Sequence, residues 1–368
     1  RGGRALGGTH LAGSLEVGAT IAYCGGDTSQ IVTELGQVRP TVLPSVPRIF
    51  EKVYAVALSM APAGSEQMIA DAVQLGVKVR TARQRGEEVS EAEDAAFEAV
   101  DAEMFAFVRG IFGGHVTLAI SGAAPISPEI LEFFYACGVP VFEGWGMTET
   151  TSLGTLNLPD AFRFGTIGRP VPGCDIRIAP DGEIEIAGEI VMREYWENPE
   201  ATAEVMTPDG YLRTGDLGAI DEDGFVRITG RKKDIIITAG GKNLTPTNLE
   251  GDLRRSRWIS QAVMFADRKP YPVALITLDA DEIVPWAAER GLPTDLVELA
   301  RHPEVHALIQ AELDAANARY ASVEQIKKFK ILPNDFSVDS GELTPTLKLK
   351  RNVVYSAYAD EFESFYAG

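Results

Sequence analysis

Apolar and polar positions follow different periods in successive parts of the chain, and these periods predict its elements. Residues 1–50 contain apolar stretches such as GATIAYCGG and PTVLPSVPRIF, interrupted by glycine and proline, which predicts a strand–turn–helix region. Residues 51–113 are predicted to be helical, because apolar side chains recur three and four positions apart and form one amphipathic face. The residues of this face are Phe97, Val100, Met104 and Val108.

Residues 116–142 predict a strand, a loop, a helix and a second strand. The buried-strand patterns are VTLAI and VPVF, and the helix EILEFFYAC lies between them. Ser127, followed by proline, is a predicted capping hydroxyl at the start of this helix, and Gly138 is its predicted end. This order is the βαβ unit of a parallel sheet, so the loops 121–126 and 143–152 leave the carboxyl ends of parallel strands. Open α/β folds bind ligands at that edge.

From residue 165 to residue 230 the chain changes to short β-rich pieces separated by turns, which predicts a compact antiparallel region. Its turn signals are Asp181-Gly182, Asp209-Gly210 and Asp223-Gly224. The stretch RKKDIIITAGGKNLTPTNLE is typical of a junction, and beyond it QAVMFADRKPYPVALITLD predicts a hairpin and PEVHALIQAELDAANARYA a helix. We therefore predict two domains, 1–231 and 232–368.

Composition excludes several classes of function. The chain has 368 residues, with 34 basic and 53 acidic side chains and a formal charge of −19, which argues against nucleic-acid binding. No apolar run approaches the roughly 20 residues of a membrane span. Three widely spaced cysteines and four histidines argue against a disulfide framework or a structural zinc site, and a reduced cytoplasm is the simplest setting. We interpret the basic cluster Lys78, Arg80, Arg83 and Arg85 as a solvated face rather than a membrane-contact patch.

Candidate chemistry begins in the loop FEGWGMTETTS. Thr148 offers a hydroxyl that can donate to phosphate, and Glu149 offers a carboxylate that can hold Mg²⁺. Trp145 has two interpretations, since its ring can flank a planar base or pack in the core. Further along, the carboxylate of Asp216 in YLRTGD can accept bonds from both hydroxyls of a ribose, or cap a turn.

Three later stretches are also ambiguous when taken singly. GRKKD contains Arg231 and Lys233, and its alternative interpretation is a solvated linker. AGGKN contains Gly240 and Gly241, whose backbone can approach a ligand closely. LTPTLKLKR places Lys348 in a polar, proline-marked segment that is otherwise a basic surface run.

The ordered set is more specific than its parts. SGAAP, EGWGMTET, YLRTGD, GRKKDIIITAGGKN and LTPTLKLKR, in this order and spacing, resemble the motifs of AMP-forming acyl-CoA synthetases. This adenylating superfamily also includes luciferases and peptide-synthetase adenylation domains. The resemblance covers nearly the whole chain and is greatest to the long-chain fatty acid branch. It implies an α/β fold, in which the C-terminal part of a large adenylating domain, a parallel sheet with helices plus a small antiparallel β region, precedes a small mobile α+β domain.

The resemblance implies roles for particular residues. Thr148 is implied to contact phosphate, Glu149 to hold Mg²⁺, and Asp216 to bind the ribose hydroxyls. Trp145 stands beside the adenine, where the family usually has tyrosine, and Lys348 is the lysine of the adenylation step. The remaining implied residues are Gly122, Ala123, Ala124 and Pro125 at the adenine and acyl carboxylate, Gly146 in the nucleotide site, Arg231 at the ribose and phosphate, Lys233 at the hinge, and Gly240 and Gly241 on the thiol path.

The implied reaction uses ATP, Mg²⁺ and coenzyme A. A fatty carboxylate attacks the α-phosphorus of ATP and releases pyrophosphate, and the thiol of coenzyme A then displaces AMP from the acyl-adenylate. Lys348 suits the first step as a compact cation on a long stem. Two alternatives stay open, an adenylating ligase for another acid or acceptor (an aryl acid, a carrier protein or a luciferase-like reaction) and a truncated, non-catalytic adenylate-binding protein.

The sequence departs from the family pattern at one point. The family's glycine- and hydroxyl-rich phosphate loop, with its lysine, normally precedes the region matched here, and neither that loop nor GxxxxGK[ST] is found in this sequence. We therefore expect the chain to begin inside the large domain, to be inactive as given, and to expose unpaired sheet edges that favour aggregation. Acyl chain length and oligomeric state are not indicated. Peripheral membrane contact fits a hydrophobic substrate, although no membrane anchor is visible in this sequence.

Overall fold

The computed structural model describes residues 13–25, 30–62, 64–344 and 348–367. These residues form two compact units. The first contains the described residues up to Thr214 together with Gly218–Ile228, and the second contains Gly215–Leu217 together with the described residues from Thr229 onward. Each unit has its own hydrophobic core. The boundary at residue 231 stays a prediction.

The first unit is built on a five-stranded sheet in the order β1-β2-β3-β4-β5. The first three strands are parallel, and β4 and β5 continue the sheet in antiparallel pairing. Their bounds are β1 Val42–Ser45, β2 Leu118–Ser121, β3 Val141–Trp145, β4 Thr155–Leu156 and β5 Arg169–Pro170. The predicted strand–loop–helix–strand order and its parallel pairing are confirmed.

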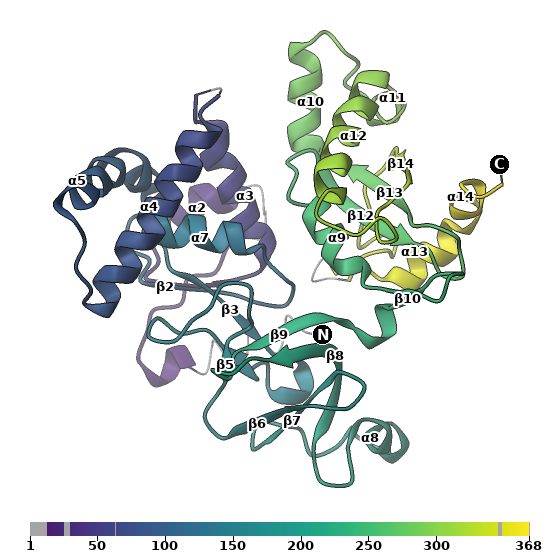
Figure 1. Ribbon diagram of the computed structural model, residues 1–368, viewed down its shortest axis with the longest axis horizontal. Helices are drawn as coiled ribbons and strands as arrows, with labels where there is room; N and C mark the ends of the chain where they lie inside the picture. The colour runs from purple at the N-terminus through teal and green to yellow at the C-terminus, as the bar shows by residue number, and fades with distance from the viewer. Residues whose placement is uncertain (1–12, 26–29, 63, 345–347, 368) are drawn as a thin grey trace. The chain divides into compact units, whose positions relative to one another are not determined.

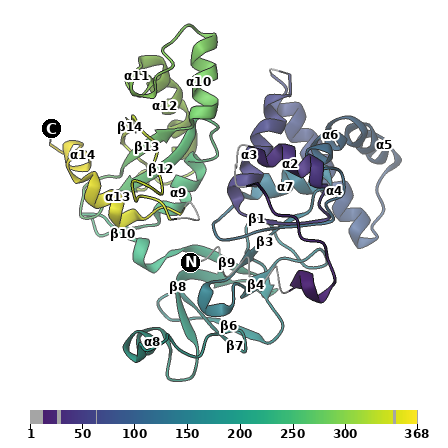
Figure 2. The same cartoon turned by 180° about the vertical axis from the view of Figure 1, so that it is seen from behind.

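Helices cover one face of the parallel strands, as both views show for α3, α4 and α7 (Figures 1 and 2). The helix α7 is buried on most sides because seven of its ten residues are apolar and enclosed by α4, α3 and the sheet. Its neighbour α4 approaches closely at Gly76, where an added Cβ would lie 2.7 Å from that of Ala136. The helix bounds are α2 Ile31–Val38, α3 Pro47–Ser59, α4 Glu66–Arg85, α5 Glu91–Val100, a π-helical turn Asp101–Phe105, α6 Ala106–Ile111 and α7 Pro128–Cys137.

A second, four-stranded sheet follows in the order β6-β7-β8-β9. The strands are β6 Cys174–Ile178, β7 Glu183–Gly188, β8 Leu212–Ile220 and β9 Val226–Arg231, with the short helix α8 Pro199–Val205 between β7 and β8. All three predicted Asp-Gly turns are confirmed, since their glycines adopt φ of 86°, 89° and 81°, where glycine is favoured. Residues 215–217 of β8 and 229–231 of β9 group with the second unit.

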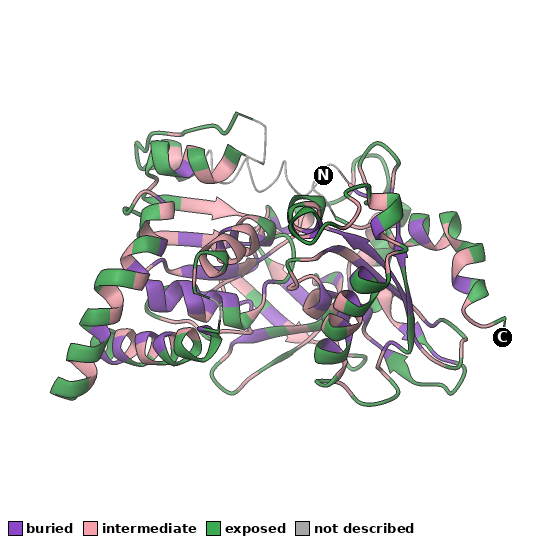
Figure 3. Ribbon diagram, turned by 90° about the horizontal axis from the view of Figure 1, so that it is seen from above, coloured by how far each residue is buried: buried purple, intermediate pink, exposed green. Residues whose placement is uncertain are grey.

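The second unit is a three-stranded sheet in the order β12-β13-β14 with helices on both faces. All six residues of β13 are buried, because alternate side chains enter two different cores. Ala274 and Ile276 belong to the core that includes α9 and α12, whereas Val273 and Leu275 belong to the core that includes α13 and α14. Buried residues accordingly concentrate on strands and on the inner faces of helices (Figure 3).

The elements of the second unit are β10 Ile236–Ile237, β11 Asn243–Leu244, α9 Pro246–Leu253, β12 Ile259–Phe265, β13 Val273–Leu278, α10 Ala280–Glu289, α11 Leu296–Leu299, α12 Pro303–Asn317, β14 Lys328–Leu332, α13 Arg351–Ala357 and α14 Ala359–Ser364. The strands β12 and β13 pair antiparallel and β14 runs parallel to β13. The predicted hairpin and the predicted helix after residue 302 are therefore confirmed.

Two local predictions need correction. Ser127 is the N-cap residue of α7, but its hydroxyl caps no backbone N–H. It instead donates to the carboxylate of Glu129 at 2.8 Å, because that acceptor lies only two residues away. The basic cluster on α4 is not simply solvated, since Lys78, Arg80 and Arg83 form ion pairs with carboxylates of α5 and the π-helical turn.

Candidate functional site

The parallel strands of the first unit end in a row of polar side chains. Ser45, Ser121 and Glu143 are register neighbours, at the carboxyl ends of β1 and β2 and two residues before the end of β3. Neighbouring strands lie about 4.8 Å apart, and register neighbours in parallel strands face the same way. Ser121 and Glu143 are both buried, at 1% and 8% exposure, and the Ser121 hydroxyl makes no hydrogen bond. A polar row at this edge is unusual for the end of a core sheet and marks a ligand edge.

The loop after β2 is held to the end of β3 by Glu143. The backbone N–H of Ile126 donates to the Glu143 carboxyl, and the N–H of Gly122 donates to the carbonyl of Ser45 at 3.2 Å. Burial raises the pKa of the Glu143 carboxyl to about 8, and the bond from Ile126 opposes that rise. Ala123 has a left-handed φ of 73°, which is uncommon for a residue with a Cβ. Between its two anchored ends the loop presents exposed residues, namely Ala123, Ala124 and Pro125.

The loop after β3 explains why its glycines flank a tryptophan. An added Cβ at Gly146 would lie 2.4 Å from the backbone of Ser152, so only glycine allows the chain to fold back there. Trp145 is 9% exposed, lies in the core of the β6–β9 sheet with Ile186, and packs against Gly154. The tryptophan therefore has a packing role in this structure, and its predicted place beside the adenine stays a prediction.

The tip of the same loop carries the hydroxyl and carboxylate groups. Thr148 is exposed, Glu149 is half-buried, and Thr150 is buried with its hydroxyl bonded to the backbone of Met147. The hydroxyl of Tyr195 donates to Oε1 of Glu149 at 2.8 Å. Burial and this carboxylate raise the pKa of Tyr195 to about 12, so the tyrosine remains a donor at neutral pH.

Glu149 suits a magnesium ion that is held mainly by substrate. Mg²⁺ keeps several waters and usually takes one or two protein carboxylates plus phosphate oxygens. Among the described residues no group of three or more histidine, cysteine, aspartate or glutamate side chains is gathered to hold a metal. A single carboxylate oriented by Tyr195 beside an exposed threonine fits that mode of binding.

The remaining candidates belong to the second unit. Asp216 is 6% exposed and lies in the middle of β8, directly after Gly215, which takes a φ of 75° inside the strand. Nε of Arg231 donates to Oδ1 of Asp216 at 2.8 Å. Lys348 is exposed as a whole residue. Partial burial of its side chain nevertheless lowers the pKa of its ammonium, the positive charge of Arg231 lowers it further, and the carboxylate of Asp216 raises it. The structure thus brings Asp216, Arg231 and Lys348 into one electrostatic cluster.

The predicted hinge and thiol-path residues lie in two short exposed segments of the second unit. Lys233 is exposed in a 3₁₀ turn, Lys232–Asp234, that directly follows β9. Gly240 and Gly241 form the turn between β10 and β11, where Gly241 has a φ of 74° and its N–H donates to the carbonyl of Thr238. The first segment directly follows Arg231, the second lies nine residues or more beyond it, and both belong to the same unit as the Asp216–Arg231 pair.

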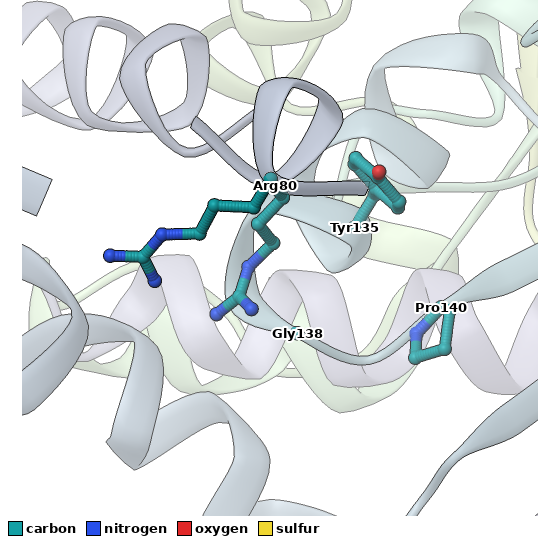
Figure 4. Close-up of a pocket in the computed structure, with 5 residues that line it drawn as sticks. Arg80, Tyr135, Gly138 and Pro140 are labelled. Carbon is teal, nitrogen blue, oxygen red and sulfur yellow. The ribbon is translucent and has the colours of Figure 1, made fainter. Parts of the chain in front are cut away.

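A surface pocket of about 260 Å³ in the first unit is not part of this site. It is lined by Arg80, Arg83, Tyr135, Gly138 and Pro140 (Figure 4). Gly138 and Pro140 precede β3, so the pocket lies at the amino end of that strand, opposite the loops that follow β2 and β3. Its arginines are engaged, Arg80 with Asp101 and the carbonyl of Ala136, and Arg83 with two carboxylates of α5.

Sequence reasoning missed three side chains that shape the site. Glu143 stood inside a quoted motif, and a carboxylate at the end of the apolar run VPVF was the signal that could have drawn attention to it. Ser121 also stood inside a quoted motif, SGAAP, but nothing local in the sequence shows that its buried hydroxyl lacks a hydrogen-bond partner. Tyr195 is 46 residues from Glu149 in sequence, so no spacing rule links them.

Comparison with solved structures defines the class of fold. The adenylation domain of a carboxylic acid reductase from Segniliparus rugosus, solved with AMP and a co-purified carboxylic acid, aligns with a TM-score of 0.68 at 23% identity, over 97% of this chain and 52% of that one. The adenylation domain of the carboxylate reductase from Mycobacterium chelonae aligns with a TM-score of 0.67 at 24% identity, over 94% and 50%. The fold is that of adenylation domains.

The chain belongs to the AMP-binding enzyme family. The family model described as AMP-binding enzyme matches residues 5–196, and that of the AMP-binding enzyme C-terminal domain matches residues 233–368. The predicted resemblance and fold class are therefore confirmed.

The sequence relatives are long-chain ligases. The long-chain-fatty-acid–CoA ligase FadD15 of Mycobacterium tuberculosis is 41% identical over 345 residues, which cover 92% of this chain and 57% of the relative. The long-chain-fatty-acid–CoA ligase ACSBG2 of Xenopus laevis is 34% identical over 90% of this chain and 48% of its own length. The chain thus spans about half the length of the curated relatives it matches. No helix in the described part of the chain has the length and apolar character to cross a membrane.

Proposed function

We propose that this chain belongs to a long-chain fatty acid–CoA ligase, which activates a fatty acid with ATP and passes the acyl group to coenzyme A. The observation that carries the proposal is 41% identity to a long-chain-fatty-acid–CoA ligase over 92% of this chain. The geometry adds support, because the candidate residues of the first unit gather at the carboxyl edge of its parallel strands.

In the first half-reaction a carboxylate oxygen of the fatty acid attacks the α-phosphorus of ATP, and pyrophosphate leaves. Thr148 donates a hydrogen bond to phosphate, and Glu149, oriented by Tyr195, holds Mg²⁺. The ion supplies positive charge that offsets charge on the phosphate oxygens. Gly122, Ala123, Ala124 and Pro125 border the adenine and the acyl carboxylate, Trp145 lies beside the adenine, and Gly146 belongs to the nucleotide site. Positioning and charge stabilisation supply most of the catalysis in such a step.

Three residues of the second unit are assigned to the ribose, the phosphate and the adenylation step. Asp216 accepts bonds from the ribose hydroxyls, and Arg231, already paired with it, assists at the ribose and phosphate. Lys348 supplies the cation for adenylation. In the second half-reaction the sulfur of coenzyme A attacks the acyl carbonyl and AMP leaves, with Gly240 and Gly241 along the thiol path.

We also propose that the protein is organised as a large domain, 1–231, and a small mobile domain, 232–368, with a hinge at Lys233. Two half-reactions that need different surroundings at one site favour such a hinge. The exposed 3₁₀ turn at Lys232–Asp234 supports this placement, since few packed side chains oppose rotation there. We propose that the enzyme is cytoplasmic and reaches its hydrophobic substrate through peripheral contact with a membrane.

The test is carboxylate-dependent adenylate formation, trapped with hydroxylamine, across acids from acetate to long fatty acids, with ATP and Mg²⁺. A signal that rises with chain length supports the proposal, and a maximum with aryl or short acids contradicts its substrate class. If no acid gives a signal, binding of a long-chain acyl-adenylate analogue, compared with an aryl-adenylate analogue, decides whether the chain keeps the site and its acyl preference.

A further inference from the structure

The segment that carries Lys348 is followed directly by a buried ion pair. Arg351, the first residue of α13, is matched with Glu250 of α9 by two bonds, Nη1 to Oε1 and Nη2 to Oε2, each at 2.6 Å. The two side chains are 10% and 5% exposed, so the pair is enclosed by protein. Two parallel bonds between a planar guanidinium and a planar carboxylate fix orientation as well as distance.

The pair joins three elements. The N–H of Met264 in β12 donates to Oε1 of Glu250 at 2.7 Å, and the hydroxyl of Tyr355 in α13 donates to the carbonyl of Met264 at 2.7 Å. Burial disfavours the charge of Arg351, and the Glu250 carboxylate more than compensates, so the pKa of the guanidinium is raised. The start of α13 is therefore tied to both α9 and β12.

The Lys348 segment is held by backbone contacts, by a bond from the Lys348 N–H to the hydroxyl of Thr344, and by Leu349, which packs against the core that includes α13 and α14. Leu343 and Leu349 form an antiparallel bridge, and the N–H of Thr344 donates to the carbonyl of Lys348 at 2.8 Å. The N–H of Lys350 donates to the carbonyl of Glu342 at 2.7 Å. These contacts set the local shape of the segment, and Arg351 adds a connection to α9 and β12.

Stability alone is a poor reason for such a pair. Replacing a buried ion pair by apolar side chains of similar volume is often neutral or stabilising, because two charges lose their hydration. What a bidentate pair adds is a defined position for the backbone on either side. Nε of Arg351, which makes no hydrogen bond, also lies 4.0 Å from Asp234, next to the predicted hinge residue Lys233.

We propose that Arg351 is a positioning residue for Lys348, and that its pair with Glu250 fixes the start of α13 so that the Lys348 ammonium is held in the Asp216–Arg231 cluster. The value of this placement for catalysis rests on the proposed function. The placement itself does not, and it is measurable without turnover.

The primary measurement is the reaction of the Lys348 amine with an amine-specific reagent, followed by peptide mass spectrometry in the full chain from about pH 7 to about pH 11. Arg351→Lys keeps the charge but loses the two-bond geometry. We expect Lys348 to leave its cluster, so that the midpoint of its labelling profile rises by about half a pH unit or more toward an ordinary lysine. Lys330, in an exposed pair with Glu361, is the internal reference and should not move.

Arg257→Lys is the matched control, because Arg257 also gives two bonds to one carboxylate, Glu282, but on the exposed side of the same unit.

A second variant, Glu250→Met with Arg351→Met, separates stability from position. We expect it to melt near the wild-type temperature and still to shift the Lys348 profile. An unchanged profile in a folded Arg351→Lys or double-methionine variant overturns the proposal, and so does loss of the fold in both.

Failure of the proposed function has a different signature. If Lys348→Ala leaves adenylate formation intact, the role of Lys348 is wrong, whereas the labelling profiles still report on its position. In an adenylating enzyme, Arg351→Lys should lower kcat for adenylate formation several-fold with little change in KM for ATP, and should spare thiol transfer from supplied acyl-adenylate.

Discussion

At the scale of single residues, Glu143 is a carboxyl group that the fold removes from water. It lies within β3 at 8% exposure, and its pKa rises from an ordinary 4.5 to about 8 because burial penalises the carboxylate. Between these values the folded protein keeps a proton that the unfolded chain has lost. The stability that Glu143 contributes is therefore full below about pH 4.5 and is lost as pH rises to about 8.

Glu143→Gln should remove this pH dependence. The amide is neutral at every pH and its carbonyl can still accept from Ile126, so the unfolding free energy of the wild type relative to the variant should fall from about pH 5 to about pH 8. The fall is a few kcal/mol at most, since one pKa unit corresponds to about 1.4 kcal/mol. Urea unfolding at the two pH values measures it. Glu88→Gln, at an exposed position, is the control, and equal pH slopes for wild type and Glu143→Gln would refute the buried-acid interpretation.

Lys348 gives the sharpest test of a catalytic role. Lys348→Ala removes the cation proposed for adenylation, so adenylate formation should fall by at least about 100-fold, as for loss of a key electrostatic group. Thiol transfer from supplied acyl-adenylate should be largely kept, because that step has no charge on pyrophosphate to stabilise. Lys350→Ala, an exposed lysine two positions away, should leave both steps near wild type. Equal loss of both half-reactions in Lys348→Ala would contradict the assigned role.

At the scale of elements, the end of α7 is held by arginine side chains from α4 and α6. Asp101, in the π-helical turn, accepts from both Arg80 and Arg109, which in turn donate to the carbonyls of Ala136 and Cys137. Those carbonyls belong to the last turn of α7, where no intrahelical donor remains for them. The π-helical turn between α5 and α6 thus supplies the Asp101 carboxylate that orients both arginines.

Asp101→Ala should destabilise the first unit by about 2 kcal/mol, because two partly buried guanidiniums lose their shared counter-charge. The measurement is the urea midpoint with the slope checked for change. Glu98→Ala removes an exposed partner of Arg83 on the neighbouring helix and should cost no more than about 0.5 kcal/mol. Similar losses of unfolding free energy in the two variants would mean that Asp101 contributes no more than one partner of an ordinary surface ion pair.

At the scale of the whole molecule, the parallel sheet ends at β1 in the part of the chain that the structure describes. Pro44 lies within β1, which suits an edge strand because proline cannot donate to a neighbour. Val42 in the same strand is 52% exposed. An edge with exposed apolar residues is a template for pairing with another chain.

Val42→Lys should therefore reduce self-association of this chain. A charged side chain on an edge strand disfavours edge-to-edge pairing, so the variant should scatter less light and elute more as monomer than the wild type at equal concentration. Val323→Lys, which also replaces a 52% exposed valine but lies outside the strands, is the control. A wild-type chain that is monodisperse and monomeric would contradict both this prediction and the expected poor solution behaviour.

Local signals predicted much of the fold. Three predictions that rest on residues close together in the sequence are confirmed. They are the apolar stripe that contains Phe97 and Val108, the βαβ order and the Asp-Gly turns. The Ser127 cap failed because a competing acceptor, Glu129, lay equally near.

Within the candidate site the sequence indicated which loops matter but not which contacts order them. Tyr195 reaches Glu149 across 46 residues, and Arg351 reaches Glu250 across 101. Such pairs leave no periodic trace, because the spacing between their members is set by the fold and not by a helix turn or a strand repeat.

The grouping of residues 215–217 with the second unit has a consequence for recombination between relatives. A chimera joined at residue 232 inherits Asp216 and Arg231 from one parent and Lys348 from the other. Since Arg231 and Asp216 both act on the charge of the Lys348 ammonium, such a crossover mixes the two halves of one electrostatic unit. Parents that differ at position 216 or 231 therefore change one part of the lysine's environment, in addition to the burial that contributes most to its lowered pKa.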